Sequence, residues 1–511
     1  MLSIFDNGPS TPCPASFNMA AYVLSQAETH KNKVALEIVG TSAQSTTTRW
    51  TFSELSQAVA SLAYGFTQSG LNQGDRILFR LGNSAETPIA YLAAIWAGFI
   101  PVPTSPLLTL SETSKIIAFL KPSMILHEAP IPCPDTPGRI SKEQMNRLMH
   151  MGEMPPVPGD PDRAAYMVFT SGTSGSPRAV EHAHRAIWAR RMMHKDWYAL
   201  RPTDRLMHAG AFNWTFTMGT GLMDPWSIGA TALIPAPDTL PQDLLCLAAQ
   251  KEATIFAAAP GVIRKLCKSN ADVDLPHLRH GLSAGEKLGR DTRDAWRTCT
   301  GTDLHEAFGM SECSTFLSGN PALPAEQETL GRPQTGRRVA IVDKTGTPVE
   351  IGTPGIIAVH SSDPGLMRGY FDETGSVHVP MFQDWFLTGD QGTMDQNGNI
   401  SCLGRADDMM NAGGYRVSPI EVEMAFANFP GIETIAVSDI IVKQDVRVIM
   451  AFYTALHEVA AEELAQYAAQ HLASYKCPRE FVHVRELPTG PNGKLARKNL
   501  QLLWNAQNGQ T

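Results

Sequence analysis

The sequence predicts an α/β protein: a large N-terminal domain of stacked, mostly parallel sheets with crossover helices and a β-rich subdomain, then a small C-terminal α+β lid domain. A chain of 511 residues is too long for one ordinary core. Helix-like and strand-like segments alternate from Arg76 onwards, which favours parallel sheets. The residues after Gly404 form a self-contained α+β pattern, so we place the domains at 1–403 and 404–511.

The first clearly periodic segments predict a helix, a strand and a second helix. Thr51 and Glu54 have the spacing of a capping box, and apolar residues recur at helical intervals behind them. Residues 76–80 are typical of a short strand. The apolar run 89–100 is bounded by prolines and is too short to span a bilayer, which indicates a buried helix and no membrane anchor. The proline-rich segment 126–162 is typical of a surface connector.

Later segments continue this alternation. Strands are expected over 254–258 and 280–282, with their ends facing a crevice, because open α/β sheets bind ligands at the carboxyl ends of their strands. The remaining expected elements are a helix over 184–197, a turn at Gly219–Gly221, antiparallel strands over 339–342 and 355–359, a capped helix from Ser418, strands over 434–437, 446–453 and 481–484, and a helix over 462–472.

The amino-acid composition limits the kinds of partner that the protein is expected to bind. With 42 basic and 50 acidic side chains the net charge is -8, and no long run of either sign occurs, which argues against nucleic acid. The eight cysteines are scattered without metal-ligand spacing, as in a protein with reduced thiols. Residues 1–17 lack the basic and apolar regions of a secretory signal, so a cytoplasmic location is expected.

A loop of hydroxyls and glycines follows the apolar run 164–169. Small residues let the backbone approach a bulky anion, and hydroxyls and N–H groups donate to it, so the loop predicts phosphate binding rather than a flexible Ser/Gly linker. Pro177 excludes the pattern of a P-loop. The residues expected to bind phosphate are Thr170, Ser171, Gly172, Thr173, Ser174, Gly175 and Arg178.

Five further motifs accompany this loop, and together the six resemble the adenylate-forming superfamily, which includes acyl- and aryl-CoA ligases, carrier-protein adenylation domains and luciferases. The motifs stand in the family's order over nearly the whole chain, and the benzoate/aryl-CoA ligase branch is the most similar. They are the loop at 169–180, Ala307–Glu312, Leu387–Asp390, Gly404–Asp408, Gly414–Pro419 and Pro491–Arg497.

The resemblance implies that a carboxylate attacks the α-phosphate of ATP, which gives an acyl-adenylate and pyrophosphate, and that coenzyme A then takes the acyl group. A carboxylate with a pKa of about 4 to 5 is already ionised at neutral pH, so this chemistry needs positioning and charge neutralisation rather than a general base. Glu312 is the implied Mg²⁺ ligand. Lys494 is the implied bridge between carboxylate and α-phosphate, and Arg405 the implied third catalytic residue.

The resemblance also assigns nucleotide-binding and hinge residues. Asp390 is expected on the ribose and Glu306 on the adenine amino group, and the other nucleotide residues are Gly285, Glu286, Phe308, Gly309, Ser311 and Arg405. Asp407 is the expected hinge of the lid, and Gly413, Gly414 and Arg416 are expected beside the pantetheine arm. Two positions depart from the family pattern: Arg178-Ala179 replaces Lys-Gly, and Asn411 stands where many relatives have lysine.

The acid is expected to be a hydrophobic monocarboxylate, aromatic or medium-chain, because no basic residue stands where it would meet a distal carboxylate. The expected pocket residues are Phe212, Trp214, Ser283, Ala284, Gly285 and Met310. Aromatic residues at such spacing are equally typical of a core.

Two other functions stay open: a stand-alone enzyme that loads a carrier-protein pantetheine, and a nucleotide-binding relative without activity. Surface arginines that bind the 3′-phosphate of CoA would favour the ligase, and the candidates are Arg190-Arg191 and Arg337-Arg338. A homodimer is possible.

Overall fold

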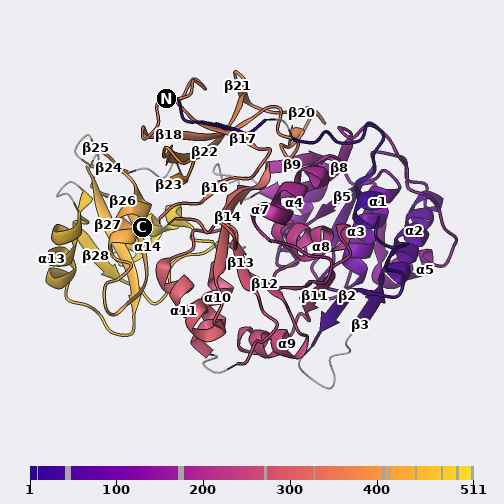
Figure 1. The fold of residues 1–511 in the computed structure, drawn as a ribbon, viewed down its shortest axis with the longest axis horizontal. Helices are drawn as coiled ribbons and strands as arrows, with labels where there is room; N and C mark the ends of the chain where they lie inside the picture. The colour runs from indigo at the N-terminus through magenta and orange to yellow at the C-terminus, as the bar shows by residue number, and fades with distance from the viewer. Residues whose placement is uncertain are drawn as a thin grey trace.

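The computed structural model describes residues 1–8, 10–40, 48–170, 178–269, 273–326, 328–405, 410–412, 415–443, 446–472, 476–490 and 494–507. The N-terminal half of the chain forms a layered α/β body, a β-rich unit lies beside it, and the C-terminal segment forms a separate small unit (Figure 1). This architecture confirms the predicted fold class.

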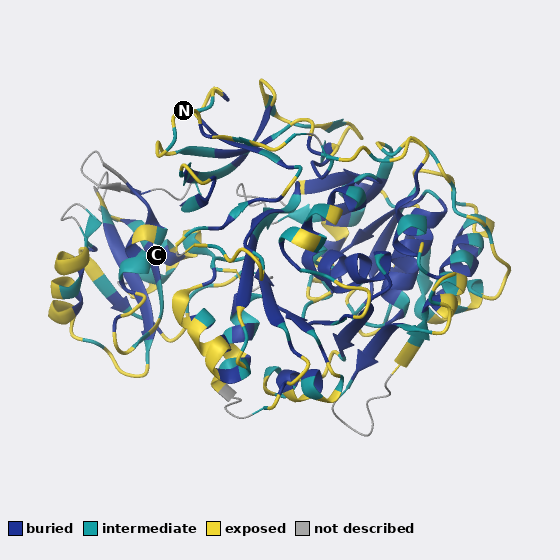
Figure 2. Cartoon of the chain, viewed as in Figure 1, coloured by how far each residue is buried: buried dark blue, intermediate teal, exposed yellow. Residues whose placement is uncertain are grey.

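The largest sheet forms the centre of the N-terminal body. Its order is β16 (Arg332–Pro333), β15 (Ser314–Ser318), β14 (Leu304–Met310), β13 (His280–Ala284), β12 (Ile255–Ala257), β10 (Arg205–His208), β11 (Thr231–Pro235), β2 (Val34–Val39) and β3 (Thr48–Thr51). The strands from β14 to β2 pair in parallel, and the outer ones are antiparallel. Parallel strands need cover on both faces, and most residues of these strands are buried (Figure 2).

Three further sheets complete the first 405 residues. One is parallel, with the order β5 (Ile100–Pro103), β4 (Arg76–Arg80), β6 (Met124–His127) and β7 (Arg139–Ser141). A second has the order β20 (Val377–His378), β19 (Gly369–Phe371), β9 (Arg178–Ala183) and β8 (Ala164–Thr170). The β-rich unit contains β1 (Ile4–Asp6), β17 (Arg338–Val342), β18 (Gly355–His360), β22 (Trp385–Met394), β21 (Met381–Phe382) and β23 (Ile400–Arg405).

Beyond Arg405 the described strands pair only with one another. They are β24 (Met410–Ala412) with β25 (Tyr415–Val417), and β26 (Ile432–Lys443), β27 (Val446–Ala455) and β28 (Glu480–His483). A core of its own holds this unit together, with Phe426, Val437 and Tyr453 among its buried members. The small unit therefore has the sheet and the core that a separately moving lid requires.

Most predicted helices are present, and their caps follow from the sequence. Thr51 caps α2 with the expected capping box, in which Thr51 Oγ1 accepts from the Glu54 N–H at 3.2 Å. The α-helices are α1 (Met19–Val23), α2 (Phe52–Gln68), α3 (Glu86–Trp96), α4 (Leu110–Leu120), α5 (Lys142–Leu148), α6 (Ala186–Ala189), α7 (Arg191–Asp196), α8 (Asp224–Ser227), α9 (Leu244–Gln250), α10 (Pro260–Ser269), α11 (Arg290–Thr300), α12 (Pro419–Ala425), α13 (Ala461–His471) and α14 (Leu500–Gln507).

Two local predictions are wrong. The segment 126–162 is not a plain connector, because it contains β7 and α5, and Ser141 caps α5 through a capping box with Gln144. The glycines of Gly219–Gly221 lie inside a π-helix, Thr217–Met223, rather than in a turn. They are required by close packing: a Cβ on Gly219 would lie 2.2 Å from the Arg190 guanidinium carbon, and one on Gly221 would lie 2.8 Å from the His208 side chain.

Candidate functional site

The turn after β14 sits where the parallel strands end, and backbone packing fixes its shape. β15 returns antiparallel to β14 with a register shift between Phe308 and Gly309. A Cβ at Gly309 would lie 2.2 Å from the Ser314 carbonyl oxygen, so only glycine fits there. The Met367 N–H donates to the Glu312 carbonyl at 2.7 Å. The turn thus holds Ser311 and Glu312 in fixed positions.

Glu312 is 8% exposed, and a tyrosine orients its carboxylate. The Tyr370 hydroxyl, on β19, donates to Glu312 Oε1 at 2.8 Å. Within the described chain Oε2 has no hydrogen-bond partner. Burial first, and then the Glu312 charge, raise the pKa of Tyr370, so its proton stays on the phenol. The guanidinium of Arg178 lies over the Tyr370 ring, 5.2 Å from its centroid. The ends of β9, β14 and β19 therefore converge on one carboxylate.

An open crevice lies on one side of β14. Seven of the predicted nucleotide residues line it: Gly285, Glu286, Glu306, Phe308, Gly309, Asp390 and Arg405. Pro419, Ile420 and Arg497 line it from the small unit. The crevice is thus bounded by both parts of the chain.

Asp390 and Arg405 face each other across β22 and β23. They are paired residues in the sheet, and Asp390 Oδ2 lies 3.7 Å from Arg405 Nη1. Gly389, with φ +80°, brings the backbone next to this guanidinium: a Cβ there would lie 3.0 Å from Arg405 Nη2. The sheet therefore places one carboxylate and one cation side by side at the rim of the crevice.

Glu306 is buried in the crevice wall and already has protein partners. Its Oε1 accepts from the Leu288 N–H at 3.0 Å and its Oε2 from Arg293 at 2.6 Å. Burial raises the pKa of Glu306 in spite of the Arg293 charge. Since each oxygen accepts one bond and keeps a further lone pair, its contact with adenine stays a prediction.

Lys494 reaches this site from the small unit. The Gly490 N–H donates to the Lys494 carbonyl at 2.7 Å, and Thr489 forms an antiparallel bridge with Leu495, so backbone pairing holds Lys494 in place. The side chain keeps contact with solvent, but the surrounding protein desolvates its ammonium enough to lower the pKa of Lys494. Arg405 also lowers it, while Glu286, Asp390 and Glu312 raise it. Four predicted site residues thus lie within electrostatic reach of Lys494.

A second, smaller cavity lies on the other side of the turn. Phe212, Trp214 and Met218 line it, together with Tyr91, Tyr166, Val168, His182, Arg190, Ser311 and Ser314. Trp214 also packs on Gly285, where a Cβ would lie 2.6 Å from its ring. Because Gly285 lines the crevice, the Trp214 indole and the β14 turn lie between the two spaces.

Three other predicted pocket residues do not line either cavity. Ser283 is fully buried, and its hydroxyl donates to the Ala258 carbonyl at 2.9 Å inside the central sheet. Ala284 is buried, and Met310 packs against the large core. Contact of these residues with an acid stays a prediction.

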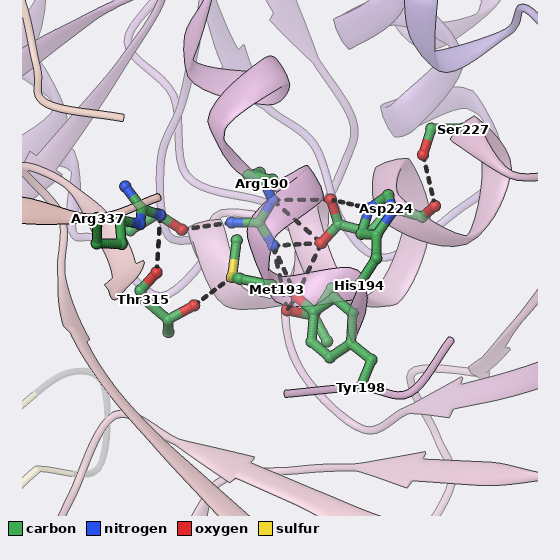
Figure 3. A network of polar contacts seen from close by, with 10 residues as sticks. Arg190, Met193, His194, Tyr198, Asp224, Ser227, Thr315 and Arg337 are labelled. Atoms are coloured by element: carbon green, nitrogen blue, oxygen red, sulfur yellow. Dashed lines mark hydrogen bonds and ion pairs between the residues drawn. The ribbon is translucent and has the colours of Figure 1, made fainter. Parts of the chain in front are cut away.

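Arg190 and Arg337 are not surface cations, so these two predictions are wrong. Arg337 is fully buried and pairs with Asp363 at 2.6 Å, and Arg190 is 6% exposed. Figure 3 shows the network around Arg190: its Nε lies 2.9 Å and 3.1 Å from the two Asp224 oxygens, and its Nη2 donates to Tyr198 and Thr220. The consecutive arginines in the sequence do not indicate that Arg190 pairs with Asp224, which lies 34 positions further along the chain.

The remaining predicted residues fall at or beyond the limits of the described chain. Thr170 ends β8 opposite Arg178 at the start of β9, so the phosphate loop connects two paired strands. Ser171, Gly172, Thr173, Ser174, Gly175, Asp407, Gly413 and Gly414 lie outside the described residues, as does the side chain of Arg416. In the part that is described, no helix is long and apolar enough to cross a membrane.

Comparisons with known proteins agree with this geometry. The family model of the AMP-binding enzymes matches residues 23–371, and that of the AMP-binding enzyme C-terminal domain matches residues 421–494. Human mitochondrial acyl-coenzyme A synthetase ACSM2A is 27% identical over 88% of this chain and 84% of its own. The 3-hydroxybenzoate–CoA ligase of Aromatoleum sp. (strain CIB) is 27% identical over 89% of this chain and 92% of its own.

Solved structures share the fold. The anthranilate CoA ligase AuaEII in complex with anthranoyl-AMP superposes with a TM-score of 0.85 at 22% identity, over 97% of this chain and 99% of its own. A benzoate CoA ligase from Burkholderia xenovorans LB400 gives a TM-score of 0.82 at 24% identity, over 95% and 100% of the two chains. The chain therefore belongs to the AMP-binding enzyme family, the adenylate-forming superfamily of acid–thiol ligases that its six motifs predicted.

Proposed function

We propose that the protein activates a hydrophobic monocarboxylic acid, aromatic or medium-chain, with ATP to an acyl-adenylate and then transfers the acyl group to coenzyme A, releasing pyrophosphate and AMP. One observation carries this proposal: a cavity with many aromatic and apolar side chains, lined by Ser311, and a charged crevice, lined by Gly309, lie on the two sides of the β14 turn, with Lys494 close by. A carboxylate in the cavity and a nucleotide in the crevice would meet at this turn.

Charge neutralisation is the main task of the site. Attack of a carboxylate on the α-phosphate brings two anions together, so the step needs cations held in place beforehand. Lys494 supplies an ammonium near the junction, and Arg405 supplies a guanidinium that Asp390 orients. Asp390 also presents carboxylate oxygens that accept from ribose hydroxyls.

The donor set at Glu312 fits a magnesium ion that is bound mainly through the nucleotide. Mg²⁺ usually keeps several waters and takes one or two carboxylates plus phosphate oxygens. Tyr370 holds one Glu312 oxygen, and the other has no partner in the described chain. Within the described residues no cluster of three or more ligating side chains occurs, as expected for a metal that arrives with ATP. When bound, the ion would neutralise phosphate charge.

In this proposal the small unit also serves the second half-reaction, the transfer of the acyl group to the thiol. We propose that it rotates about Asp407 after adenylation, removing Lys494 and bringing residues 413–416 to the site. The named CoA ligases among the relatives favour coenzyme A over a carrier-protein pantetheine as the acceptor.

ATP–pyrophosphate exchange over a panel of acids tests the first half-reaction. We expect exchange with at least one apolar monocarboxylate, and dependence on added Mg²⁺. Thioester formation is then measured with coenzyme A and with a phosphopantetheinylated carrier protein. Exchange with no acid of the panel would contradict the proposal, and transfer to the carrier alone would replace its second half.

A further inference from the structure

The wall of the acid-side cavity contains hydrogen-bonding groups that a purely hydrophobic acid does not use. His182, on β9, is 1% exposed and lines this cavity. Its Nε2 lies 2.7 Å from the Ser311 carbonyl oxygen. A carbonyl oxygen only accepts, so Nε2 carries the proton and Nδ1 is left as an acceptor. Nδ1 is buried and has no partner among the residues described.

Arg190 adds a donor to the same wall. Its Nε and Nη2 are occupied by Asp224, Tyr198 and Thr220, and its Nη1 donates to the Ser314 hydroxyl. Nη1 carries two hydrogens, and Ser314 is its one partner in the described chain, so one N–H remains for a ligand. Arg190 and Ser314 both line the cavity. Asp224, which pairs with Arg190, neutralises the charge of the guanidinium.

Tyr166 connects these two groups. Its ring stacks on His182 with centroids 4.7 Å apart and planes 14° apart. Arg190, His182 and Tyr166 line the same cavity, so all three belong to one patch. The Tyr166 hydroxyl makes no hydrogen bond to any described residue. The patch therefore offers an acceptor, a donor and a hydroxyl beside the aromatic faces of Phe212 and Trp214.

We infer that the acid substrate carries a neutral hydrogen-bonding substituent, a hydroxyl or an amino group, which donates to His182 Nδ1 and accepts from Arg190 Nη1 or from Tyr166. Buried polar groups without partners are costly, and a substituent of this kind satisfies them where a hydrocarbon tail leaves them unpaired. A second carboxylate fits less well, because Asp224 already balances the one cation. This inference rests on the proposed function and narrows its substrate class to hydroxylated or aminated aromatic acids.

Matched acids test the inference in the wild-type protein. The kcat/KM of adenylation is measured for benzoate against the three hydroxybenzoates and the three aminobenzoates, and for hexanoate against 6-hydroxyhexanoate. At least one hydroxylated or aminated benzoate should exceed benzoate by about 10- to 100-fold, because a site built around a hydrogen bond rejects the analogue that lacks it. If benzoate and hexanoate equal or exceed every substituted partner, the inference is wrong and the proposed function stands. Exchange with none of these acids contradicts both.

His182→Phe keeps the stack on Tyr166 and removes the acceptor. Loss of the hydrogen bond to the Ser311 carbonyl acts on all acids alike. The ratio of kcat/KM between a substituted and an unsubstituted acid therefore reports the role of Nδ1 alone. We expect this ratio to fall about 10-fold or more. Met223→Leu is the matched control, because it changes the wall of the same cavity without removing a nitrogen or oxygen atom and should preserve the ratio. An unchanged ratio in the folded His182 variant, or equal falls in both variants, would overturn the inference.

Discussion

The two cavities on either side of the β14 turn are built in different ways. The nucleotide-side crevice is lined by charged residues and glycines at strand ends, and the small unit supplies part of its wall. The acid-side cavity lies wholly within the N-terminal body, and its lining comes from segments scattered between Tyr91 and Ser314. One space depends on short local motifs and on residues of the small C-terminal unit, whereas the other depends on how distant segments pack.

This difference separates the residues expected to act in adenylation from the residues expected to determine which acid is accepted. Under the proposed function, residues that neutralise phosphate act on every acid alike, so the crevice would determine whether adenylation occurs. Residues that touch the acid determine which acid reacts, and changes there should alter ratios between acids. Changes on the two sides of β14 are therefore expected to give different patterns across one acid panel.

Lys494→Ala should have the largest effect and should lower adenylation by about 10³-fold or more for every acid, because it removes a cation from the junction. ATP–pyrophosphate exchange measures this loss. Lys498→Ala is the matched control, since it removes an exposed lysine of the same unit outside the crevice. Normal exchange in the Lys494 variant would show that the crevice does not depend on the lid for adenylation.

Glu312→Gln should lower exchange by about 10²- to 10³-fold and raise the Mg²⁺ concentration needed for half-maximal rate, because an amide binds this ion more weakly than a carboxylate. Tyr370→Phe removes the hydroxyl that orients Glu312 and should cost about 10-fold. An unaltered Mg²⁺ dependence in both variants would remove Glu312 from the metal site.

Arg190→Met should destabilise the fold by about 3 to 5 kcal/mol in urea unfolding, because Asp224 stays behind as a buried charge without its partner. Arg190→Met combined with Asp224→Leu should recover most of this loss, since it removes both charges together. Such recovery would identify the pair as a structural part of the acid-side wall. A double variant that is less stable than the single one would contradict that description.

The pH dependence of adenylation should reveal the environment of Lys494. The protein around its ammonium lowers the pKa of Lys494 below its usual 10.5, so the rate should fall on the alkaline side before an ordinary lysine loses its proton. Lys494→Arg keeps its charge over this range, so its residual activity should lack the alkaline fall. The same alkaline fall in both proteins would assign it to another group.

The sequence predicted the crevice more fully than the cavity for a physical reason. Asp390 and Arg405 line the crevice and lie in short motifs whose backbone geometry requires nearby glycines, so the local sequence determines where these side chains stand. The Arg190–Asp224 pair depends on helix packing around the π-helix at 217–223, which no short pattern reveals. For the same reason Arg190 was predicted at the surface, and Gly219 and Gly221 in a turn.

The predicted phosphate loop is flanked by two residues of the described chain. Its flanks, Thr170 and Arg178, are paired residues of β8 and β9. The exchange of the family's lysine for Arg178 places a guanidinium over Tyr370, next to Glu312. Arg178→Lys tests whether this contact matters: it should leave the ratios between acids unchanged, because Arg178 does not line the cavity proposed to bind the acid.

The most direct test of the central claim is ATP–pyrophosphate exchange over one acid panel with the wild-type protein, Lys494→Ala and His182→Phe side by side. We predict that Lys494→Ala lowers exchange for all acids by a common factor, and that His182→Phe changes the ratios between acids. A Lys494 variant that alters selectivity, combined with a His182 variant that lowers every acid equally, would contradict the division between a catalytic crevice and a selective cavity.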